Sequence, residues 1–404
     1  MTLTEAKVIN AVVINKDIHT LLTAPDELFT AYHDVYATLK KHYQKYRAVP
    51  SLESLQRQHP DLEKFNADEP TAFYVDELKS EYLNKRMEDL IVKAANALDS
   101  DMTPQETLEK LTNSISKLSA FTSQASDLNL KDVEAAERHF QNQAERAKQN
   151  GGVPGIPTGF KSLDSVYATG MAPGHSIILF GRTGRGKSLI AALMAAKAYA
   201  QGYKPMIVSL EMSKEEQMER IYTILASGIF TMSGMARGEV DLEEFKSWSE
   251  DALKQDFIIV SNEGNQDVTP NFIQGKINQH RPDVVILDYM QLMMDNGKNS
   301  GMTPRMLALS REIKLLAVSS NIPIISISGI TDKDNDDQSE PPTLDQVSWS
   351  AGIKYDANLA IAVQKAQNSN IIAMVIRKNR NGDLAACYLD CDIDRGIFEE
   401  RFTL

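Results

Sequence analysis

The stretch "LFGRTGRGKS", residues 179–188, lies near the middle of the chain and determines what fold can surround it. It matches the pattern G-x-x-x-x-G-K-[ST], which average residue usage would produce by chance in only about one chain per hundred of this length. Residues 176–180 before it form an apolar run that predicts a short buried strand, and residues 188–200 after it favour a helix. Strand, glycine loop and helix in this order predict a phosphate-binding loop.

Each residue type in this loop has a physical role. Glycines allow a tight turn that points backbone N–H groups at phosphates, and the helix that follows adds the positive end of its dipole. Lys187 is expected to reach the β- and γ-phosphates, and Ser188 to ligate Mg²⁺. The predicted ligands are ATP or another nucleoside triphosphate and Mg²⁺; the alternative is a glycine-rich turn without a ligand. The predicted nucleotide-binding residues are Gly181, Thr183, Gly184, Arg185, Gly186, Lys187 and Ser188.

Composition limits the class of protein. With 404 residues, of which 42% are hydrophobic, the chain is long enough for two or three domains. Its two cysteines, Cys387 and Cys391, form neither a disulfide framework nor a zinc ligand set, and no apolar run reaches transmembrane length. These features predict a cytoplasmic protein without a membrane segment. The formal net charge of −12 argues against a generally basic nucleic-acid coat, although it allows a local basic channel.

Residues 1–120 are predicted to form a small all-α domain, because apolar and aromatic residues recur there at three- and four-residue spacing. We interpret two such stripes as core seams, with a partner surface as the alternative for the aromatic one. The stripes comprise Tyr32, Val35, Tyr36, Leu39, Tyr43 and Tyr46, and then Leu83, Met87, Leu90, Ile91, Ala94 and Leu98. A further helix has a clear start, because Thr103 can cap it, Pro104 suits the first helical position and Glu106 completes a capping box.

Residues 121–152 are predicted to form a linker that carries a helix. The segment 131–149 has a helical pattern, but its only large apolar residues are Val133 and Phe140. The glycine- and proline-rich stretch "NGGVPGIPTG" then separates it from everything that follows. Such a helix buries little against its own chain, so we expect it to dock elsewhere, for example on a neighbouring subunit. A simple solvated spacer is the alternative.

Residues 153–404 change to a pattern of alternating strands and helices. Five apolar runs predict strands, and their continuous character is typical of a parallel sheet covered on both faces. The runs are "SIILF", "PMIVSLE", "FIIVS", "DVVILDY" and "IPIISIS". Nearer the C-terminus, two strand-like runs flank Asn381 and Gly382, a dipeptide that favours a tight hairpin turn. The predicted fold is α/β with a mostly parallel sheet, preceded by a small all-α domain and a linker helix.

Two acidic residues follow predicted strands. Asp288 ends the apolar run 284–287, which in a doubly wound sheet means the ligand-binding carboxyl edge, so we expect it to support Mg²⁺. Glu211 ends the run "PMIVSLE" at the same edge, where a carboxylate can orient and deprotonate a water that attacks the γ-phosphate. The alternatives are a strand-terminating cap for Asp288 and an ordinary terminal acid for Glu211.

Several segments after the phosphate loop resemble the ATPase domain of the DnaB-type hexameric replicative helicases, including phage-encoded members. They are "SLEMSKEEQMERIYTILAS", "VVILDYMQLM", "SREIKLLAVSSNIPIISIS" and "RKNRNG", in this order. The N-terminal helical region and "GIPTGFKSLDSV" also resemble that family, so the resemblance covers nearly the whole chain. It implies a RecA-like P-loop ATPase domain and a ring, usually of six subunits, in the cytoplasm of a bacterial or phage-infected cell.

The resemblance also implies an activity and partners. The ring would encircle one DNA strand, move along it 5′ to 3′ using nucleotide hydrolysed between subunits, and unwind duplex DNA at the replication fork. Carried over by position, Glu211 is the catalytic base and Asp288 supports the metal. Lys378 and Arg380 would reach a neighbour's γ-phosphate. Single-stranded DNA, further copies of the chain, and a primase or helicase loader are the implied partners.

Two departures from the family pattern concern the coupling to DNA. Where the family usually carries a glutamine able to sense the γ-phosphate, this chain has Gly329, which has no side-chain donor. The inner DNA loop is matched here by "SWSAG", residues 348–352, and the acidic run 331–340 before it repels phosphates. Either backbone N–H groups and other positive residues hold the strand, with Lys298 as a candidate, or the coupling to DNA is unusual or weak in this protein. Trp349 is expected to pack on the protein, with stacking on a base as the alternative.

Two other functions fit part of the sequence. A RecA-like recombinase or clock-type ATPase would share the phosphate loop and Asp288, but not both the tyrosine-striped N-terminal region and "DYMQLM". A nucleotide-dependent ring scaffold that recruits a primase or loader is kept open by Gly329 and the acidic loop. Stimulation of ATP hydrolysis by single-stranded DNA separates a motor from a scaffold.

Overall fold

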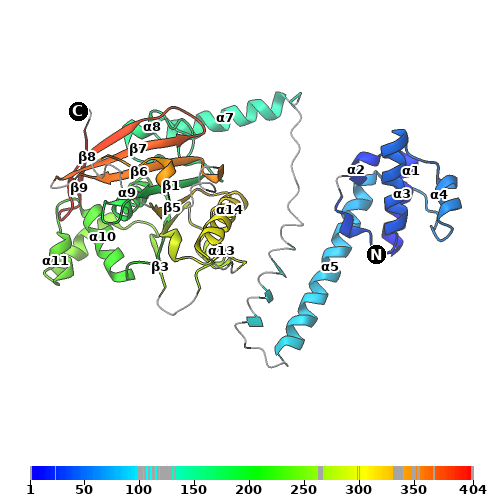
Figure 1. Ribbon diagram of the computed structural model, residues 1–404, viewed down its shortest axis with the longest axis horizontal. Helices are drawn as coiled ribbons and strands as arrows, with labels where there is room; N and C mark the ends of the chain where they lie inside the picture. Colours follow the sequence, from blue (N-terminus) through cyan, green and yellow to red (C-terminus); the bar gives the residue numbers. More distant parts are fainter. Residues whose placement is uncertain are drawn as a thin grey trace. The chain divides into compact units, whose positions relative to one another are not determined.

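The computed structural model describes residues 2–22, 24–98, 103, 106–107, 110–111, 114–115, 118, 130–131, 133–262, 267–297, 299, 301–330, 340–347, 352, 355–366 and 369–401. The chain divides into two units, Met1–Asp127 and Leu128–Leu404. Each unit has a hydrophobic core of its own. Figure 1 draws the helices and strands of both units.

The regular elements among the described residues of the N-terminal unit are all helices or 3₁₀ turns. The elements are α1 (Thr2–Asn15), α2 (Ile18–Leu22), η1 (Asp26–Leu28), α3 (His33–Tyr46), α4 (Leu52–Gln58) and α5 (Thr71–Leu98). From the first predicted stripe, Val35, Tyr36 and Leu39 are buried in the core of this unit. Thr103 and Glu106 form the predicted capping box, because the Glu106 N–H donates to Thr103 Oγ1 at 3.3 Å and the Thr103 N–H donates to Glu106 Oε2 at 2.9 Å.

The second predicted stripe is not a core seam. Met87 and Ile91 are 54% and 66% exposed, so the core interpretation is wrong for this part of α5. The buried residues of α5 lie in its first half, where the helix packs on α1, α2 and η1, and they include Val75 and Leu78. No described element of this unit covers the second half, and apolar periodicity alone does not reveal which part of a long helix will meet a partner.

In the C-terminal unit, nine strands among the described residues form one sheet in the order β3-β2-β4-β5-β1-β6-β7-β8-β9 (Figure 1). The strands are β1 (Ser176–Gly181), β2 (Pro205–Ser209), β3 (Ile258–Ser261), β4 (Val284–Asp288), β5 (Ile324–Gly329), β6 (Leu359–Lys365), β7 (Ile371–Asn379), β8 (Ala386–Asp392) and β9 (Ile397–Arg401). From β3 to β6 every neighbouring pair is parallel, and β7, β8 and β9 add antiparallel pairs. The predicted α/β fold with a mostly parallel sheet is confirmed.

Helices cover both faces of the parallel strands. On the strands that lead to the nucleotide edge, alternate residues such as Ile207, Ile286 and Ile327 share a core with α9, whereas Val208 and Leu287 share a core with α13 and α14. Burial on both faces explains why these strands read as continuous apolar runs. The helices and 3₁₀ turns of this unit are α7 (Val133–Gln149), α8 (Lys161–Asp164), α9 (Lys187–Ala200), α10 (Lys214–Ala226), α11 (Met232–Ala236), α12 (Leu242–Ala252), α13 (Pro270–His280), η2 (Met290–Leu292), α14 (Met302–Ser320) and η3 (Leu344–Gln346).

The predicted C-terminal hairpin exists, but its predicted tight turn is wrong. β7 and β8 pair antiparallel, and residues 380–385 connect them. Neither Asn381 nor Gly382 has the positive φ that a two-residue type I′ turn requires. Instead Asn379 organises a wider loop, because its Oδ1 accepts from the Asn381 N–H at 3.1 Å and its Nδ2 donates to the Asp383 carbonyl at 2.9 Å. Gly382 serves a close approach, since a Cβ there would overlap the Val166 carbonyl.

Candidate nucleotide site

The phosphate loop has the predicted local structure. β1 leads into residues 182–186, and α9 begins at Lys187. Gly184 and Gly186 have φ values of +71° and +93°, a left-handed backbone that residues with a side chain rarely adopt. Gly181 lies so close to the backbone of β6 that a Cβ would overlap a carbonyl there. Glycine is therefore favoured at these three positions, because a side chain would strain the backbone or overlap β6.

Thr183 and Arg185 are the other two predicted residues within the loop. Thr183 is exposed, whereas Arg185 is partly buried and its Nη1 donates to the Lys365 carbonyl at 3.3 Å. The Lys365 N–H donates back to the Arg185 carbonyl at 3.2 Å. Arg185 therefore attaches the loop to the end of β6, and Thr183 is open to a ligand.

Ser188 and Asp288 are brought into direct contact. Ser188 Oγ donates to Asp288 Oδ1 at 3.1 Å, which joins the first turn of α9 to the end of β4. Asp288 is 3% exposed; burial raises the pKa of its carboxyl group, and the hydrogen bond from Ser188 lowers it. Hydroxyl and carboxylate oxygens are the hard ligands that Mg²⁺ prefers, so the oxygens of Ser188 and Asp288 fit the metal. Among the described residues, this site included, no group of three or more His, Cys, Asp or Glu residues could hold a metal ion.

Lys187 and Glu211 lie at the same carboxyl edge. Lys187 Nζ donates to the Arg182 carbonyl at 2.8 Å, which keeps the ammonium inside the loop. Burial lowers the pKa of Lys187, and the charges of Asp288 and Glu211 raise it. Glu211 is exposed two residues beyond the end of β2, the strand that pairs with β4. One ammonium and two carboxylates are therefore close enough to interact at this edge.

Lys378 and Arg380 lie where the parallel strands begin, at the amino edge of the sheet, whereas the phosphate loop lies at the carboxyl edge. Leu359, at the start of β6, pairs both with Ile177 near the start of β1 and with Asn379 at the end of β7. β1 runs from that point to the phosphate loop, a length of roughly 15 Å at about 3.3 Å per residue. The structure therefore does not bring these two residues to the phosphate loop of their own chain.

The two basic residues differ in their surroundings. Arg380 is exposed, and its Nη2 donates to the Tyr355 carbonyl. Lys378 is partly buried; burial first and the Arg380 charge second lower its pKa to about 8. Arg380 thus carries the permanent charge at the surface of this edge.

The residues predicted to contact DNA lie almost entirely outside the described residues. Lys298, Trp349 and residues 331–339 of the acidic run lie outside the described residues. Gly329 is described, and it ends β5 directly opposite Gly181, the first glycine of the phosphate loop.

Two polar residues near the nucleotide edge were not singled out from the sequence. Arg220 on α10 has two buried nitrogens, Nε and Nη1, that find no hydrogen-bond partner among the described residues. Burial lowers its pKa, and the charges of Asp288, Glu216 and Glu211 raise it, so its guanidinium lies near these acids. Gln291 in η2 has a buried Oε1 to which no group in the described part of the chain donates. The sequence gives one indication of their location, because Arg220 comes shortly after Glu211 and Gln291 shortly after Asp288.

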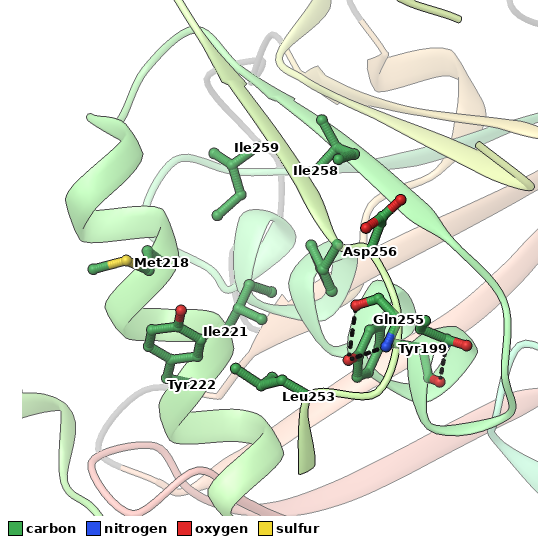
Figure 2. A pocket seen from close by; sticks show the side chains of 10 residues that line it. Tyr199, Met218, Ile221, Tyr222, Leu253, Gln255, Asp256, Ile258 and Ile259 are labelled. Atoms are coloured by element: carbon green, nitrogen blue, oxygen red, sulfur yellow. Dashed lines mark hydrogen bonds between the residues drawn. The ribbon is translucent and has the colours of Figure 1, made fainter. Parts of the chain in front are cut away.

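A separate pocket of about 270 Å³, lined by apolar and polar side chains, lies between α10 and β3 (Figure 2). Its lining includes Met218, Ile221 and Ile259, and Gln255 is tied to Tyr199, whose carbonyl accepts from Gln255 Nε2 at 2.8 Å. None of the lining residues belongs to the phosphate loop, β1 or β4. The pocket is therefore not part of the nucleotide site.

Comparison with known proteins agrees with this geometry. A family model of the DnaB-like helicase C-terminal domain matches residues 155–400. A probable plasmid replicative DNA helicase of Chlamydia trachomatis serovar L2 is 29% identical over 252 residues, which are 60% of this chain and 54% of that protein. The replicative DNA helicase DnaC of Bacillus subtilis strain 168 is 26% identical over 279 residues, 65% of this chain and 59% of that protein. The matched part thus spans little more than half the length of these curated relatives.

A solved structure has a similar fold. It is a DnaB-like replicative helicase studied with its interactions with primase; it aligns with a TM-score of 0.69 over 98% of both chains at 18% identity. Within the described part of this chain, no helix has the length and apolar character needed to cross a lipid bilayer.

Proposed function

Because this chain belongs to the family of the DnaB-like helicase C-terminal domain, we propose that it is an ATP-dependent replicative DNA helicase. Six copies of the chain form a ring that encircles single-stranded DNA. The ring moves 5′ to 3′ and unwinds duplex DNA at the replication fork. Residues 153–404 form the motor, residues 121–152 a linker whose helix docks on a neighbouring copy, and residues 1–120 a collar that recruits a primase or loader.

One observation carries this proposal: the meeting of Lys187, Ser188, Asp288 and Glu211 at one edge of a parallel sheet. The Lys187 ammonium offsets charge on the β- and γ-phosphates, and backbone N–H groups of residues 182–188 hold the phosphate oxygens. Ser188 and Asp288 would hold Mg²⁺, which would supply positive charge to the same phosphates. These groups are the ones that a nucleoside triphosphatase needs to bind the phosphates and Mg²⁺ of its substrate.

Glu211 is proposed to act as the catalytic base. Its exposed carboxylate lies two residues beyond the end of β2, the strand that pairs with β4 and Asp288, and its charge acts on the Lys187 ammonium. In this position it can accept a proton from a water whose oxygen attacks the γ-phosphorus, while the bond from that phosphorus to the β–γ bridging oxygen breaks. The energy released then drives the relative movement of neighbouring subunits.

Lys378 and Arg380 are proposed to complete the site of the next subunit. Their location at the amino edge of the sheet, far from the phosphate loop of their own chain, supports action in trans. Arg380 is exposed there and permanently charged, as required of a residue that enters a neighbour's site. A site divided in this way couples hydrolysis to contacts between subunits.

Gly329 favours a second candidate function. A glycine at the end of β5 provides no side chain with which to report the state of the γ-phosphate to DNA. A ring that binds nucleotide in order to assemble, and that recruits a primase or loader, does not need such a group. A RecA-like recombinase, which also shares the phosphate loop, is less well supported because the family model covers residues 155–400.

Hydrolysis with and without DNA separates the motor from the scaffold. We expect the steady-state ATPase rate of the purified chain with Mg²⁺ to rise several-fold on addition of poly(dT), because a translocating motor hydrolyses ATP faster when it is bound to a strand. Double-stranded DNA of equal nucleotide content is the control. Equal rates with and without poly(dT) would support the scaffold instead.

Glu211→Gln is expected to lower the hydrolysis rate by about 10²- to 10⁴-fold while nucleotide binding persists, because the amide keeps the shape but cannot take a proton. Titration with a fluorescent ATP analogue measures binding, and phosphate release measures turnover. Glu216→Gln on α10, whose acid forms a helix capping box, is the matched control and should hydrolyse ATP normally. Parallel loss of binding and turnover in Glu211→Gln would mean that Glu211 is structural.

A further inference from the structure

Residues 355–358, which lie directly before β6, hold Arg380 at two points. The Arg380 N–H donates to the Asn358 carbonyl at 3.0 Å, and its Nη2 donates to the Tyr355 carbonyl. The Tyr355 side chain is 75% exposed and Arg380 is exposed, so the Tyr355 end of this segment lies at the surface beside the guanidinium. The direction in which the guanidinium points therefore depends on where residues 355–358 lie.

Asp356 attaches this segment to α14. Its Oδ2 accepts from Ser310 Oγ at 3.0 Å, and its Oδ1 lies 3.5 Å from Arg311 Nη1. The Asp356 side chain is 11% exposed, whereas that of Arg311 is 67% exposed. Because exposed ion pairs contribute little, the hydrogen bond from the buried Ser310 hydroxyl is the stronger of the two contacts. Asp356 thus ties the main chain next to Tyr355 to the helix.

Asn358 is held by contacts that do not involve Asp356. Its Oδ1 accepts from Lys314 Nζ at 2.8 Å and from the Ser176 N–H at 3.1 Å, and its own N–H donates to the Ser176 carbonyl at 2.8 Å. These contacts join Asn358 to α14 and to the start of β1. Removal of the Asp356 carboxylate is therefore expected to release the Tyr355 end of the segment while Asn358 and β6 stay in place.

The charge of Asp356 also acts on the basic residues around Arg380. Burial first and the Arg380 charge second lower the pKa of Lys314 and of Lys378, and the charge of Asp356 raises the pKa of both. The like charges of Arg380 and the two lysines repel one another, and the Asp356 carboxylate offsets part of this repulsion. A carboxylate at position 356 therefore favours the close arrangement of Lys378 and Arg380.

We infer that Asp356 is a positioning residue for Arg380, which it presents to the phosphate groups in the site of the neighbouring subunit by tying residues 355–358 to α14. This inference rests on the proposed action of Arg380 in trans. Asp356 acts through the Tyr355 carbonyl and through its charge, not on the reacting atoms. A guanidinium has five N–H donors, so the one that Tyr355 holds leaves others for a phosphate.

The competing interpretation is that Asp356 only stabilises the ATPase unit of its own chain. The two roles differ in which subunit's site is damaged when Asp356 is lost. A positioning role damages the site of the neighbour that receives Arg380 and leaves the phosphate loop of the variant chain intact. A structural role damages the variant chain's own site and leaves Arg380 able to serve the neighbour.

In Asp356→Ala we expect the hydrolysis rate of the full-length chain to fall about 10- to 10²-fold, because a displacement of about 1 Å in a reacting group can cost a factor of this size. The affinity for a fluorescent ATP analogue should stay unchanged. Asp383→Ala, which removes an exposed acid from the loop after β7, is the matched control and should hydrolyse ATP at the wild-type rate. Thermal unfolding verifies folding, and Asp356→Asn replaces the Ala variant if that one does not fold.

Mixed rings then locate the damage, under conditions in which labelled copies exchange between rings. In an equal mixture of Asp356→Ala with Lys187→Ala, about a quarter of the interfaces pair an intact loop with a correctly held Arg380, so hydrolysis should rise above that of either parent. In a mixture of Asp356→Ala with Arg380→Ala no interface has a correctly held arginine, and hydrolysis should not rise above that of Asp356→Ala alone.

Four results would overturn the inference: a wild-type rate in the folded Asp356 variant, a loss of nucleotide affinity that accounts for the loss of rate, no rise with Lys187→Ala, or a rise with Arg380→Ala. A mixture of Lys187→Ala with Arg380→Ala keeps this failure separate from failure of the proposed function. If that mixture hydrolyses ATP, only the role of Asp356 is in question. If that mixture stays inactive although its subunits exchange, the proposed site shared between subunits fails first.

Discussion

Lys187→Ala is expected to give a folded chain whose ATP hydrolysis is at least about 10²- to 10³-fold below that of wild type. The Lys187 ammonium is held inside the phosphate loop by the Arg182 carbonyl and lies near two carboxylates. Its removal deletes the positive charge that offsets the β- and γ-phosphates in the transition state. Measured phosphate release, compared at equal protein concentration, gives the ratio directly.

The same variant should not unfold, because the hydrophobic core around β1 and α9 does not include the Lys187 side chain. Lys254→Ala provides a matched control, since that side chain is 68% exposed beyond α12. We expect the control to hydrolyse ATP at the wild-type rate. Wild-type turnover in purified Lys187→Ala would show that residues 181–188 are not the phosphate-binding loop for ATP hydrolysis.

Arg380→Ala is expected to bind nucleotide normally and to hydrolyse it about 10³- to 10⁵-fold more slowly, the range associated with an arginine supplied to a phosphoryl-transfer site. The guanidinium is exposed at the amino edge of the sheet and contacts only a backbone carbonyl in the interactions that the structure gives it, so its loss leaves the core intact. Arg395→Ala, an exposed arginine between β8 and β9, controls for loss of surface charge. Unimpaired hydrolysis by Arg380→Ala would show that the hairpin only carries solvated charge.

The parallel part of the fold follows from local sequence. β1, β2, β4 and β5 are short apolar runs buried on both faces, and that pattern has few alternatives in a chain with helical segments between the runs. Ser188 and Asp288 could be paired because parallel strands present their carboxyl ends at one edge. A distance of 100 positions along the chain is no obstacle when the sheet order joins them.

Other features depend on contacts that periodicity does not encode. The wide loop after β7 is set by the side chain of Asn379, and Gly382 is needed for its approach to Val166 rather than for a tight turn. Met87 and Ile91 follow a helical repeat but remain exposed, because burial depends on which element covers α5. The hydrogen bond from Gln291 to Ser328 could not be recognised either, because it joins η2 to β5 across 37 positions of the sequence.

Mixing Lys187→Ala with Arg380→Ala tests most directly whether neighbouring subunits share the hydrolytic site. Each variant alone should be nearly inactive, because every interface lacks either the loop lysine or the arginine. In an equal random mixture, about a quarter of the interfaces of a closed ring pair an intact loop with an intact arginine. We therefore expect ATP hydrolysis to return in part once exchange of subunits is verified by energy transfer between labelled copies. Mixtures that exchange subunits and stay as inactive as either parent would contradict a site shared between subunits.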